Sequence, residues 1–397
     1  MTDLVIIADD LTGAADSAAL LTRRGPTWVV VDPAGDWPQD AAVLAVDTNS
    51  RHTDPTTAAA RVAAATERAA GRGGQVVKKI DSTMRGNIVD ELRAMRDVLA
   101  RDSDRMLMVV APAFPATGRT TRGGVVHVAG QRLAAHGSDG DVVGMLHRGG
   151  IRALGVPGAD ASTLAARLEE AYADGFDAVV IDAASDDDVH AVVAAGRTTV
   201  VPTLLVGSGG LTRPLAEGAS APDAPLPSAA EGATLVVIGS YSEVSARQRG
   251  RLLEHGVTAV VLTDGHGTTP ELRPAVRRGA VVLSPDPDAP VVRADAAQVA
   301  RRLARAAVSV LDDIGSLVVT GGETARAVLA AAGVDRFRVT GEVEPGIVRG
   351  HVPELGIDLV TKAGSFGDVD ALLRCLPPHD SPASQSRTRA PQRGSAP

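Results

Sequence analysis

Short apolar runs recur along the first half of the chain, and a polar turn follows most of them. Their length and their content of Val, Ile and Leu are typical of buried strands in a parallel sheet. They predict strands at 4–8, near 43–46, at 75–80, at 107–114 and at 177–182.

Segments with helical spacing lie between these runs. Residues 13–25 predict a helix that closes on a glycine, and another helix is predicted around 161–174. From residue 88 onward, apolar residues recur at the spacing of one helix face, at Ile88, Leu92, Met95 and Leu99. Strands alternating with helices predict an α/β fold with a mostly parallel sheet.

The alternation restarts after residues 218–233, a stretch rich in Pro, Ala and Ser that is the best candidate for a linker. Strands are predicted at 234–240, 258–262 and 316–320, and a further strand from 357 runs into a glycine loop. Helices are predicted up to about His255, over about 294–312 and over 324–332. The chain therefore divides into two predicted α/β domains, 1–228 and 232–375, and residues 376–397 form a low-complexity tail predicted to be disordered.

Composition narrows the classes of partner. The net charge is −8 and aromatic residues make up only 2% of the chain. Nucleic-acid binding needs a basic face or stacking aromatics, so nucleic acid is not expected as the main partner. A small anionic substrate stays compatible with this charge, because a local pocket can be basic on an acidic protein.

The single cysteine, Cys375, cannot form an internal disulfide, and a reducing compartment fits this usage. The beginning of the chain, MTDLVIIADD, lacks the basic region of a signal peptide, and no apolar run is long enough to cross a membrane. These features predict a cytoplasmic protein with no membrane partner. A homo-oligomer remains open.

Polar residues follow the predicted strands of the first half. Ligands of open α/β sheets gather at the carboxyl ends of the strands, which gives functional weight to ADDLTGA (8–14), DTNSR (47–51), KKIDSTMRG (78–86) and the proline-bounded loop 111–124 with Arg119 and Arg122. Helix caps and plain loops would explain each motif alone. Together they offer acids for hydroxyls and cations for an anionic head, as a small polyhydroxy acid would need.

Lysine is rare in this chain: the 40 basic residues include only Lys78, Lys79 and Lys362. A retained lysine suggests that a compact ammonium is needed where an arginine fork would not fit. Lys79 lies two residues before Asp81, so the two side chains share a face of the strand, and Lys79 is the candidate for ligand contact. Lys78 points to the opposite face, for a structural or surface role.

Glycine loops dominate the second half. GSYS (239–242) follows a predicted strand and opens a helix, and TGGETA (320–325) repeats that design. GEVEPG (341–346) and KAGSFG (362–367) are two further glycine loops. Backbone N–H groups at such turns can hold phosphate, and four in one domain favour a nucleotide site. Neither a Walker motif nor a dinucleotide fingerprint is present. The nine histidines show no metal-ligand spacing, so the metal ligands stay unknown, and Cys375 is a poor nucleophile candidate.

Taken in order, the motifs ADDLTGA, DTNSR, KKIDSTMRGN, APAFPATGRT, GSYS, TGGETA, GEVEPG and KAGSFG resemble the four-carbon acid sugar kinase family from about residue 4 to residue 374. The resemblance implies an N-terminal acid-sugar domain and a C-terminal ATP domain, with substrate and ATP·Mg²⁺ in the cleft between them. It implies phosphorylation of the terminal O4 hydroxyl of a tetronate, and leaves open which of threonate, erythronate or a 3-oxo-tetronate is the substrate.

The residues that the resemblance implies for the substrate are Asp9, Asp10, Arg51, Lys79, Asp81, Ser82 and Arg85. Among these, Asp10, Asp81 and Lys79 are the candidate catalytic residues, and either aspartate could accept the hydroxyl proton. The residues implied for the nucleotide are Ser240, Ser242, Gly321, Gly322, Gly341, Glu342, Gly346, Lys362, Gly364 and Gly367. The alternatives are a nucleotide-dependent acid-sugar dehydrogenase or epimerase and a non-catalytic two-domain binding protein.

Overall fold

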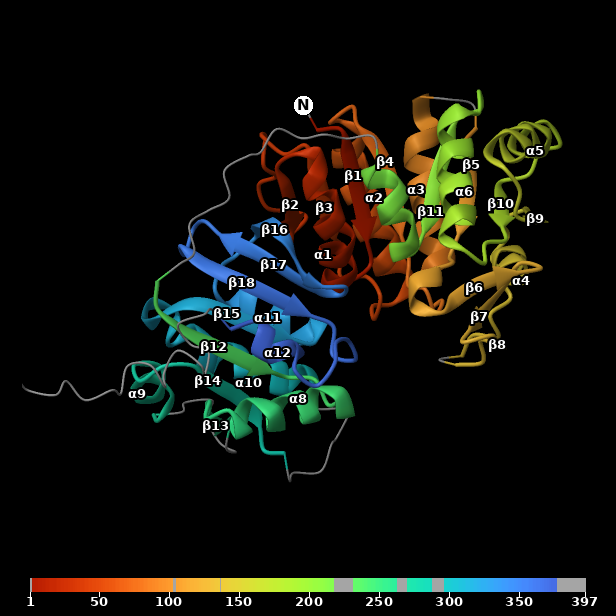
Figure 1. The fold of residues 1–397 in the computed structure, drawn as a ribbon. Coiled ribbons are helices and arrows are strands. Elements are labelled where there is room, and N and C mark those ends of the chain that lie inside the picture. Colours follow the sequence, from red (N-terminus) through yellow and green to blue (C-terminus); the bar gives the residue numbers. More distant parts are fainter. Residues whose placement is uncertain are drawn as a thin grey trace, which may run out of the picture. The chain divides into compact units, whose positions relative to one another are not determined.

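The computed structural model describes residues 2–102, 105–135, 137–217, 231–262, 270–287 and 296–376 (Figure 1). The chain divides into two compact units, Met1–Pro225 (unit 1) and Leu226–Pro397 (unit 2). Most of the predicted linker and the predicted tail after residue 376 lie outside the described residues. Within those residues, no helix combines the length and the apolar character that a membrane crossing needs.

Unit 1 is built on a parallel sheet with the strand order β2-β3-β1-β4-β11-β5-β10-β9. Its strands are β1 (Leu4–Ala8), β2 (Thr27–Val30), β3 (Val43–Asp47), β4 (Gln75–Lys79), β5 (Leu107–Ala111), β9 (Ala153–Val156), β10 (Ala178–Ile181) and β11 (Thr203–Gly207). All five residues of β1 are buried, which the sequence shows as an unbroken apolar run. The prediction of a mostly parallel α/β sheet is confirmed.

Helices cover this sheet. They are α1 (Leu11–Ala19), α2 (Pro55–Ala70), α3 (Ile88–Leu99), α4 (Val142–Arg148), α5 (Ala161–Ala173), α6 (Asp186–Thr198) and α7 (Thr212–Ala216). Helices α2 and α3 pack together and share a hydrophobic core with Val5 and Ile7 of β1. Leu4 and Ile6 point to the other face and are also buried. Both faces are therefore covered, as a doubly wound sheet requires.

A small antiparallel sheet replaces part of the loop predicted at 111–124. It comprises β6 (Arg119–Arg122), β7 (Val125–Val128) and β8 (Gln131–Arg132). The prediction of a loop is wrong for 119–122, because Gly123 and Gly124, with φ of 58° and 72°, form the two-residue turn that folds β6 back on β7.

Unit 2 has the strand order β13-β14-β12-β15-β18-β17-β16. Its strands are β12 (Ala233–Ile238), β13 (Thr258–Leu262), β14 (Val281–Pro285), β15 (Ile314–Thr320), β16 (Arg336–Glu344), β17 (Ile347–Val352) and β18 (Ile357–Lys362). The helices are α8 (Glu243–Glu254), α9 (Leu272–Val276), α10 (Ala296–Val308), α11 (Gly322–Ala331) and α12 (Ala371–Arg374). The first five strands in this order run parallel, and β17 and β16 continue the sheet antiparallel.

The segment GEVEPG, predicted as a glycine loop, lies mostly within a β-hairpin. Residues 341–344 belong to β16, and only Pro345 and Gly346 form the turn to β17. The interpretation as a loop is therefore wrong for most of the motif. Cross-strand pairing with β17 is stronger than the local preference of a glycine and two glutamates for a turn.

Candidate functional site

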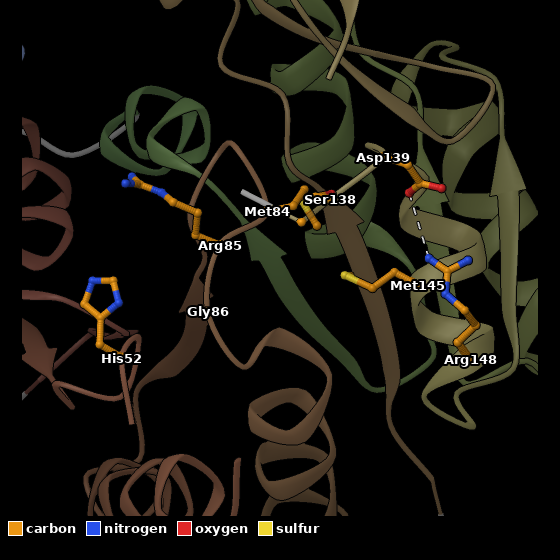
Figure 2. A pocket seen from close by; sticks show the side chains of 9 residues that line it. His52, Met84, Arg85, Gly86, Ser138, Asp139, Met145 and Arg148 are labelled. Carbon is orange, nitrogen blue, oxygen red and sulfur yellow. Dashed lines mark ion pairs between the residues drawn. The ribbon is translucent and has the colours of Figure 1, made fainter. Parts of the chain in front are cut away.

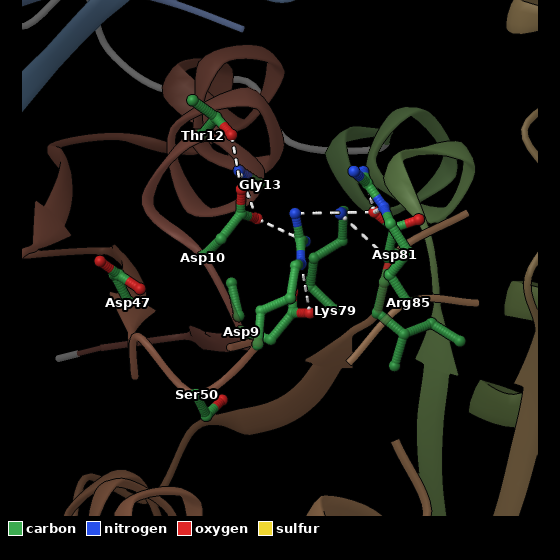
Figure 3. A network of polar contacts seen from close by, with 12 residues as sticks. Asp9, Asp10, Thr12, Gly13, Asp47, Ser50, Lys79, Asp81 and Arg85 are labelled. Atoms are coloured by element: carbon green, nitrogen blue, oxygen red, sulfur yellow. Dashed lines mark hydrogen bonds and ion pairs between the residues drawn. The ribbon is translucent and has the colours of Figure 1, made fainter. Parts of the chain in front are cut away.

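The carboxyl ends of three neighbouring strands bring the first-half motifs together. Ala8 at the end of β1 is level with Asp47 of β3 on one side and with Lys79 of β4 on the other. The loops that follow carry ADDLTGA, DTNSR and KKIDSTMRG. Figure 3 shows Asp9, Asp10, Asp81 and Arg85 of these loops and Lys79 at the end of β4 close together. The predicted gathering of these motifs at one sheet edge is thus present in the structure.

Arg51 is the centre of this network. Its Nε and Nη2 donate to Asp9 Oδ2 and Oδ1 at 2.8 and 2.7 Å, and Nη2 also donates to Asp10 Oδ1 at 2.6 Å. The Arg51 side chain is only 9% exposed. Burial alone would raise the pKa of Asp9, but Arg51 overrides it, and the pKa of Asp9 lies below its ordinary value.

Asp81 is held as a carboxylate by several donors. Its Oδ1 accepts from Thr83 N at 2.7 Å and from Thr83 Oγ1 at 2.6 Å, and its Oδ2 accepts from Arg85. Arg51 Nη1 lies 3.6 Å away. Burial opposes ionisation, yet the two arginines and Thr83 hold the pKa of Asp81 far below its usual range.

Asp10 is the most accessible of the three carboxylates. It is the N-cap of α1, where Oδ1 accepts from Gly13 N at 3.1 Å, and Thr12 Oγ1 donates to Oδ2 at 2.6 Å. Its side chain is 21% exposed, against 2% for Asp9 and 5% for Asp81. Asp10 is thus both a helix cap and the carboxylate that faces solvent at this edge.

The two adjacent lysines have different surroundings. Lys79 Nζ donates to Ile80 O at 3.1 Å. A Cβ at Gly13 would lie 3.1 Å from the same nitrogen, so the ammonium lies close to Gly13 of the ADDLTGA motif. Lys78 is fully buried and pairs with Glu91 at 2.6 Å. The structural role predicted for Lys78 is therefore present, and the surface alternative is wrong.

A pocket of about 720 Å³ has Arg85 and Gly86 in its lining. Figure 2 shows Arg85 and Gly86 between His52 and the side of the pocket formed by Met145 and Arg148. Arg85 pairs with Asp81 and also lines this pocket, so it borders both the carboxylate network and the pocket. The lining residues are His52, Met84, Arg85, Gly86, Gly137, Ser138, Asp139, Met145 and Arg148.

Arg119 lies near the same network. Burial lowers its pKa, while the charge of Asp81 acts in the opposite direction and that of Arg85 adds to the lowering. The small antiparallel sheet thus adds a fourth cation to Arg51, Lys79 and Arg85. The remaining predicted substrate residue, Ser82, is half-buried next to Asp81 in the chain.

The glycine loops of unit 2 meet at the ends of β12, β15 and β18. Gly321 N donates to Lys362 O at 2.9 Å, which links two of the loops. The carbonyl of Gly364 accepts from Ser242 Oγ at 2.6 Å, from Ser245 Oγ at 2.9 Å and from Lys362 Nζ at 3.1 Å. Ser242 is also the N-cap of α8. The structure thus brings Ser242, Gly321, Lys362 and Gly364 together, as predicted.

Lys362 is fully buried in this arrangement, and its Nζ donates to Ala363 O as well as to Gly364 O. Burial lowers its pKa to about 8, although Cys375 and Glu344 act in the opposite direction. In this structure Lys362 therefore holds the backbone of its own loop.

The other predicted nucleotide residues lie at the edges of this cluster. Ser240 Oγ donates to Ser242 Oγ at 3.3 Å, and Gly322 begins α11 directly after Gly321. Gly341 and Glu342 lie within β16, Gly346 forms the hairpin turn against Phe366, and Gly367 lies near Glu344.

Two kinds of chemistry receive no support from the described residues. They contain no group of three or more His, Cys, Asp or Glu side chains placed to hold a metal ion. Cys375 is buried, and burial raises the pKa of its thiol to about 12. A thiol that stays protonated is a poor nucleophile, which agrees with the sequence interpretation.

One buried residue beside the network is absent from the sequence-derived candidates. Glu91 contacts both Lys78 and Ser50, each at 2.6 Å. The sequence pattern could have identified Glu91, because it falls on the apolar helix face defined by Ile88, Leu92 and Met95. A charge at that position of a helix has to be paired when it is buried.

Two family models match consecutive parts of the chain. A sugar-binding N-terminal domain model matches residues 4–215, and a nucleotide-binding C-terminal domain model matches residues 235–372. A D-threonate kinase from Cupriavidus necator is 37% identical, over 93% of this chain and 96% of that protein. The chain belongs to the four-carbon acid sugar kinase family.

Other members of the family are similar over comparable lengths. A D-threonate kinase from Bordetella bronchiseptica is 33% identical, over 93% of this chain and 95% of that protein. A D-erythronate kinase from Heliobacterium modesticaldum is 28% identical, over 95% and 97%. A 3-oxo-tetronate kinase from Cupriavidus necator is 30% identical, over 92% and 94%.

Solved structures share the fold of this acid sugar kinase family member. A Salmonella typhimurium LT2 protein, whose structure carries a tRNA synthase description, matches with a TM-score of 0.78 at 22% identity, covering 94% of this chain and 99% of that one. A Haemophilus influenzae protein matches with a TM-score of 0.73 at 22% identity, covering 93% and 98%. At this identity they show the two-domain α/β fold alone.

Proposed function

We propose that this protein transfers the γ-phosphoryl group of ATP to the terminal O4 hydroxyl of a four-carbon sugar acid, with D-threonate as the first candidate. The observation that carries the proposal is the cluster of Arg51, Lys79 and Arg85 around three carboxylates, in the part of the chain that matches a sugar-binding model. The kinase names of the relatives support the reaction type.

The preference for D-threonate follows from two enzymes of one organism. In Cupriavidus necator, the D-threonate kinase is 37% identical to this chain and the 3-oxo-tetronate kinase is 30% identical. The D-threonate kinase of Bordetella bronchiseptica also exceeds the second value, at 33%. The higher overall identity to the two D-threonate kinases supports D-threonate as the first candidate.

Lys79 and Arg85 are the groups proposed to bind the carboxylate of the acid. Arg85 is 41% exposed, and a charged hydrogen bond to a carboxylate can be bidentate at a guanidinium. Arg85 also donates from Nε and Nη2, to Asp81, so what separates the two arginines is exposure. Arg51 is only 9% exposed and binds both Asp9 and Asp10, so we assign to it the orientation of these two aspartates. Ser82 is proposed to contact the hydroxyls of the substrate.

We assign to Asp10 the acceptance of the proton from O4. Asp81 is held as a carboxylate with a pKa far below its usual range, which gives it little tendency to take a proton. Asp10 is the more exposed of the two, at 21% against 5%. A general base has to reach the proton that it removes, and accessibility therefore favours Asp10.

Unit 2 is proposed to bind ATP, which supplies the phosphoryl group. The residues present fit a phosphate chain: the N-terminus of α8 follows Ser240 and Ser242, and the N-terminus of α11 follows Gly321. Thr320 Oγ1 is buried at the end of β15 without a hydrogen-bond partner within the described part of the chain. Gly341, Glu342, Gly346 and Gly367 are proposed to line the same site from the hairpin side.

Mg²⁺ is proposed to enter with ATP. The ion usually keeps several waters and is bound through substrate phosphates with one or two carboxylates, so it needs no dedicated cluster of protein ligands. Such binding does not require a group of three or more His, Cys, Asp or Glu side chains placed to hold a metal ion, and the described residues contain none. The chain's contribution is then to position the ligands and stabilise charge, which dominates phosphoryl-transfer catalysis.

The direct test measures ADP release by the full chain with ATP, Mg²⁺ and a panel of D- and L-threonate, D- and L-erythronate and 3-oxo-tetronates. We expect ADP with at least one acid, D-threonate first, and phosphorylation at O4 in the product. An Asp10→Asn variant should lose turnover while still binding ATP. No ADP above background with any acid would overturn the proposal.

The two alternatives from the sequence are less favoured. A dehydrogenase or epimerase would need a dinucleotide site, and a binding protein would not need loops for phosphate. None of the relatives named above is of either kind. Reduction of a nicotinamide cofactor in the presence of tetronates would revive the first alternative.

A further inference from the structure

A buried carboxylate links the loop that carries Arg51 to the strand that carries Lys79. Glu91 lies in the first turn of α3, and its side chain is 1% exposed. Its Oε2 is 2.6 Å from Lys78 Nζ on β4, and its Oε1 accepts a 2.6 Å hydrogen bond from Ser50 Oγ. The two oxygens of one carboxylate thus bind two different segments.

Ser50 lies directly before Arg51, and its backbone is fixed as well. Ser50 N and Arg51 N donate to Asp9 O at 3.0 and 3.2 Å. Asn87 Nδ2, next to the first residue of α3, donates to Ser50 O at 2.9 Å. A shift of Ser50 would therefore move the Cα from which the Arg51 guanidinium reaches Asp9 and Asp10.

The space around Arg51 leaves little tolerance for such a shift. Gly86 adopts φ of +95°, and a Cβ there would lie 3.2 Å from Asp9 Oδ2 and 3.4 Å from Arg51 Cγ. A side chain would press on the Arg51–Asp9 pair. The position of Arg51 is thus defined by Ser50 on one side and by the bare backbone of Gly86 on the other.

The buried ion pair between Lys78 and Glu91 is expected to add little net stability to the fold. Both side chains are buried, at 0% and 1% exposure, and taking two charges out of water offsets much of their attraction. Apolar residues of similar volume would stabilise the surrounding core as well or better. What an apolar pair cannot supply is an acceptor oxygen directed at Ser50.

We propose that Lys78, Glu91 and Ser50 form a positioning unit, the Glu91 clamp, which sets Arg51 and through it Asp9 and Asp10 for the acid substrate. Lys78 orients the Glu91 carboxylate, Glu91 fixes Ser50, and Ser50 fixes the backbone of Arg51. None of the three touches the reacting atoms. The inference rests on the proposed function, since the acid substrate is assigned to this site there.

The test uses the full chain and a variant that removes one hydroxyl. Ser50→Ala breaks the bond to Glu91, removes the 2.8 Å contact between Ser50 Oγ and Thr48 Oγ1, and leaves the Lys78–Glu91 pair in place. Misplacing a positioned group by about 1 Å can reduce rate a hundredfold, so we expect kcat/KM for the acid to fall tenfold or more. The KM for ATP should stay unchanged. Thr66→Ala is the matched control, because Thr66 is equally buried and bonds to Val62 O within α2.

A second readout does not depend on turnover. Hydrogen exchange of the amides of Ser50 and Arg51, which bond to Asp9 O, should accelerate in Ser50→Ala without ligand and stay slow in Thr66→Ala. Wild-type protein that releases no ADP with any acid would overturn the proposed function. In that case hydrogen exchange alone would test the Glu91 clamp. Unchanged protection of the Ser50 and Arg51 amides in Ser50→Ala would overturn it.

A double variant separates positioning from stability. Lys78→Met with Glu91→Leu removes both charges and leaves no charge unpaired, so we expect a melting temperature at or above that of the wild type. The same loss of kcat/KM and faster exchange at Ser50 and Arg51 should still appear. A stable double variant with wild-type kcat/KM and exchange would show that the pair serves only the fold.

Discussion

Arg51 holds Asp9 through two parallel hydrogen bonds, from Nε to Oδ2 at 2.8 Å and from Nη2 to Oδ1 at 2.7 Å. The same Nη2 donates to Asp10 at 2.6 Å. This geometry needs the planar fork of a guanidinium, which a lysine ammonium cannot reproduce.

Arg51→Lys is therefore expected to keep the charge and lose the arrangement of the two aspartates. We expect kcat/KM for the acid to fall about tenfold to a hundredfold, the value of one lost charge-assisted hydrogen bond of roughly 1.5–3 kcal/mol. Initial rates at varied acid and varied ATP would check this. An increase confined to the KM for ATP would contradict the assignment of Arg51 to the acid side.

Lys79→Arg and Lys78→Arg are expected to differ in what they damage. The Lys79 ammonium lies close to Gly13 of the ADDLTGA motif, and the residue is 8% exposed. The larger guanidinium of an arginine should therefore reduce kcat/KM for the acid about tenfold to a hundredfold. The sequence leaves a surface role open for Lys78, and at the surface Lys78→Arg would be nearly silent. Full burial reverses that expectation, because overpacking a filled core costs about 1–3 kcal/mol of stability.

Thermal unfolding of both lysine variants, together with their kinetics, measures this contrast. Lys78→Arg should lower the melting temperature, and Lys79→Arg should lower it much less. Equal and small effects of both variants on rate and stability would mean that the two lysines are interchangeable with arginine, against the packing seen at both positions.

Gly364→Ala is expected to weaken ATP binding. A Cβ at Gly364 would overlap Ser240 Oγ and lie 3.7 Å from Ser242 Oγ, so the loop would have to move away from the α8 N-terminus. We expect the KM for ATP to rise tenfold or more, with the affinity for the acid unchanged. Gly250→Ala within α8 is the control, because a Cβ there meets nothing within 4 Å and should add about 0.5–1 kcal/mol of stability. Similar ATP kinetics in both variants would contradict a nucleotide role for this loop.

Lys362 should give the protein a distinctive stability profile in alkaline solution. Its folded pKa is about 8, against an ordinary value of 10.5, so between these values the unfolded chain binds more protons than the folded one. The free energy of unfolding should therefore rise with pH across this window, by at most about 3 kcal/mol. Below about pH 8, Lys362 is protonated in both the folded and the unfolded chain, and burial of its charge then lowers the free energy of unfolding by this whole difference.

Urea unfolding of wild type and Lys362→Met between pH 7.5 and 10.5 would isolate this contribution, since the other titrating groups are shared. The variant should lack the rise, and its advantage in stability should shrink as pH increases. Parallel profiles for the two proteins would show that the ammonium of Lys362 is not destabilised by burial.

The sequence by itself determined the class of fold and the motifs of the site. Unbroken apolar runs such as LVIIA predict strands covered on both faces, and the helix predicted from Ile88 begins at that residue in the structure. Such local patterns are sufficient because burial on a strand or helix face repeats with a fixed period. The position of polar motifs after strands also predicts that Asp9, Arg51 and Lys79 meet at one edge.

Only the tertiary structure decided the partners of these groups. Nothing local in the sequence pairs Lys78 with Glu91 or directs the Arg51 fork to Asp9, because both contacts join segments brought together by sheet order and helix packing. The hairpin of β16 and β17 was misread as a glycine loop for the same reason, since its strands exist through pairing with each other and with β18. Local patterns define which face of an element is buried, whereas the identity of the neighbour depends on the fold of the whole unit.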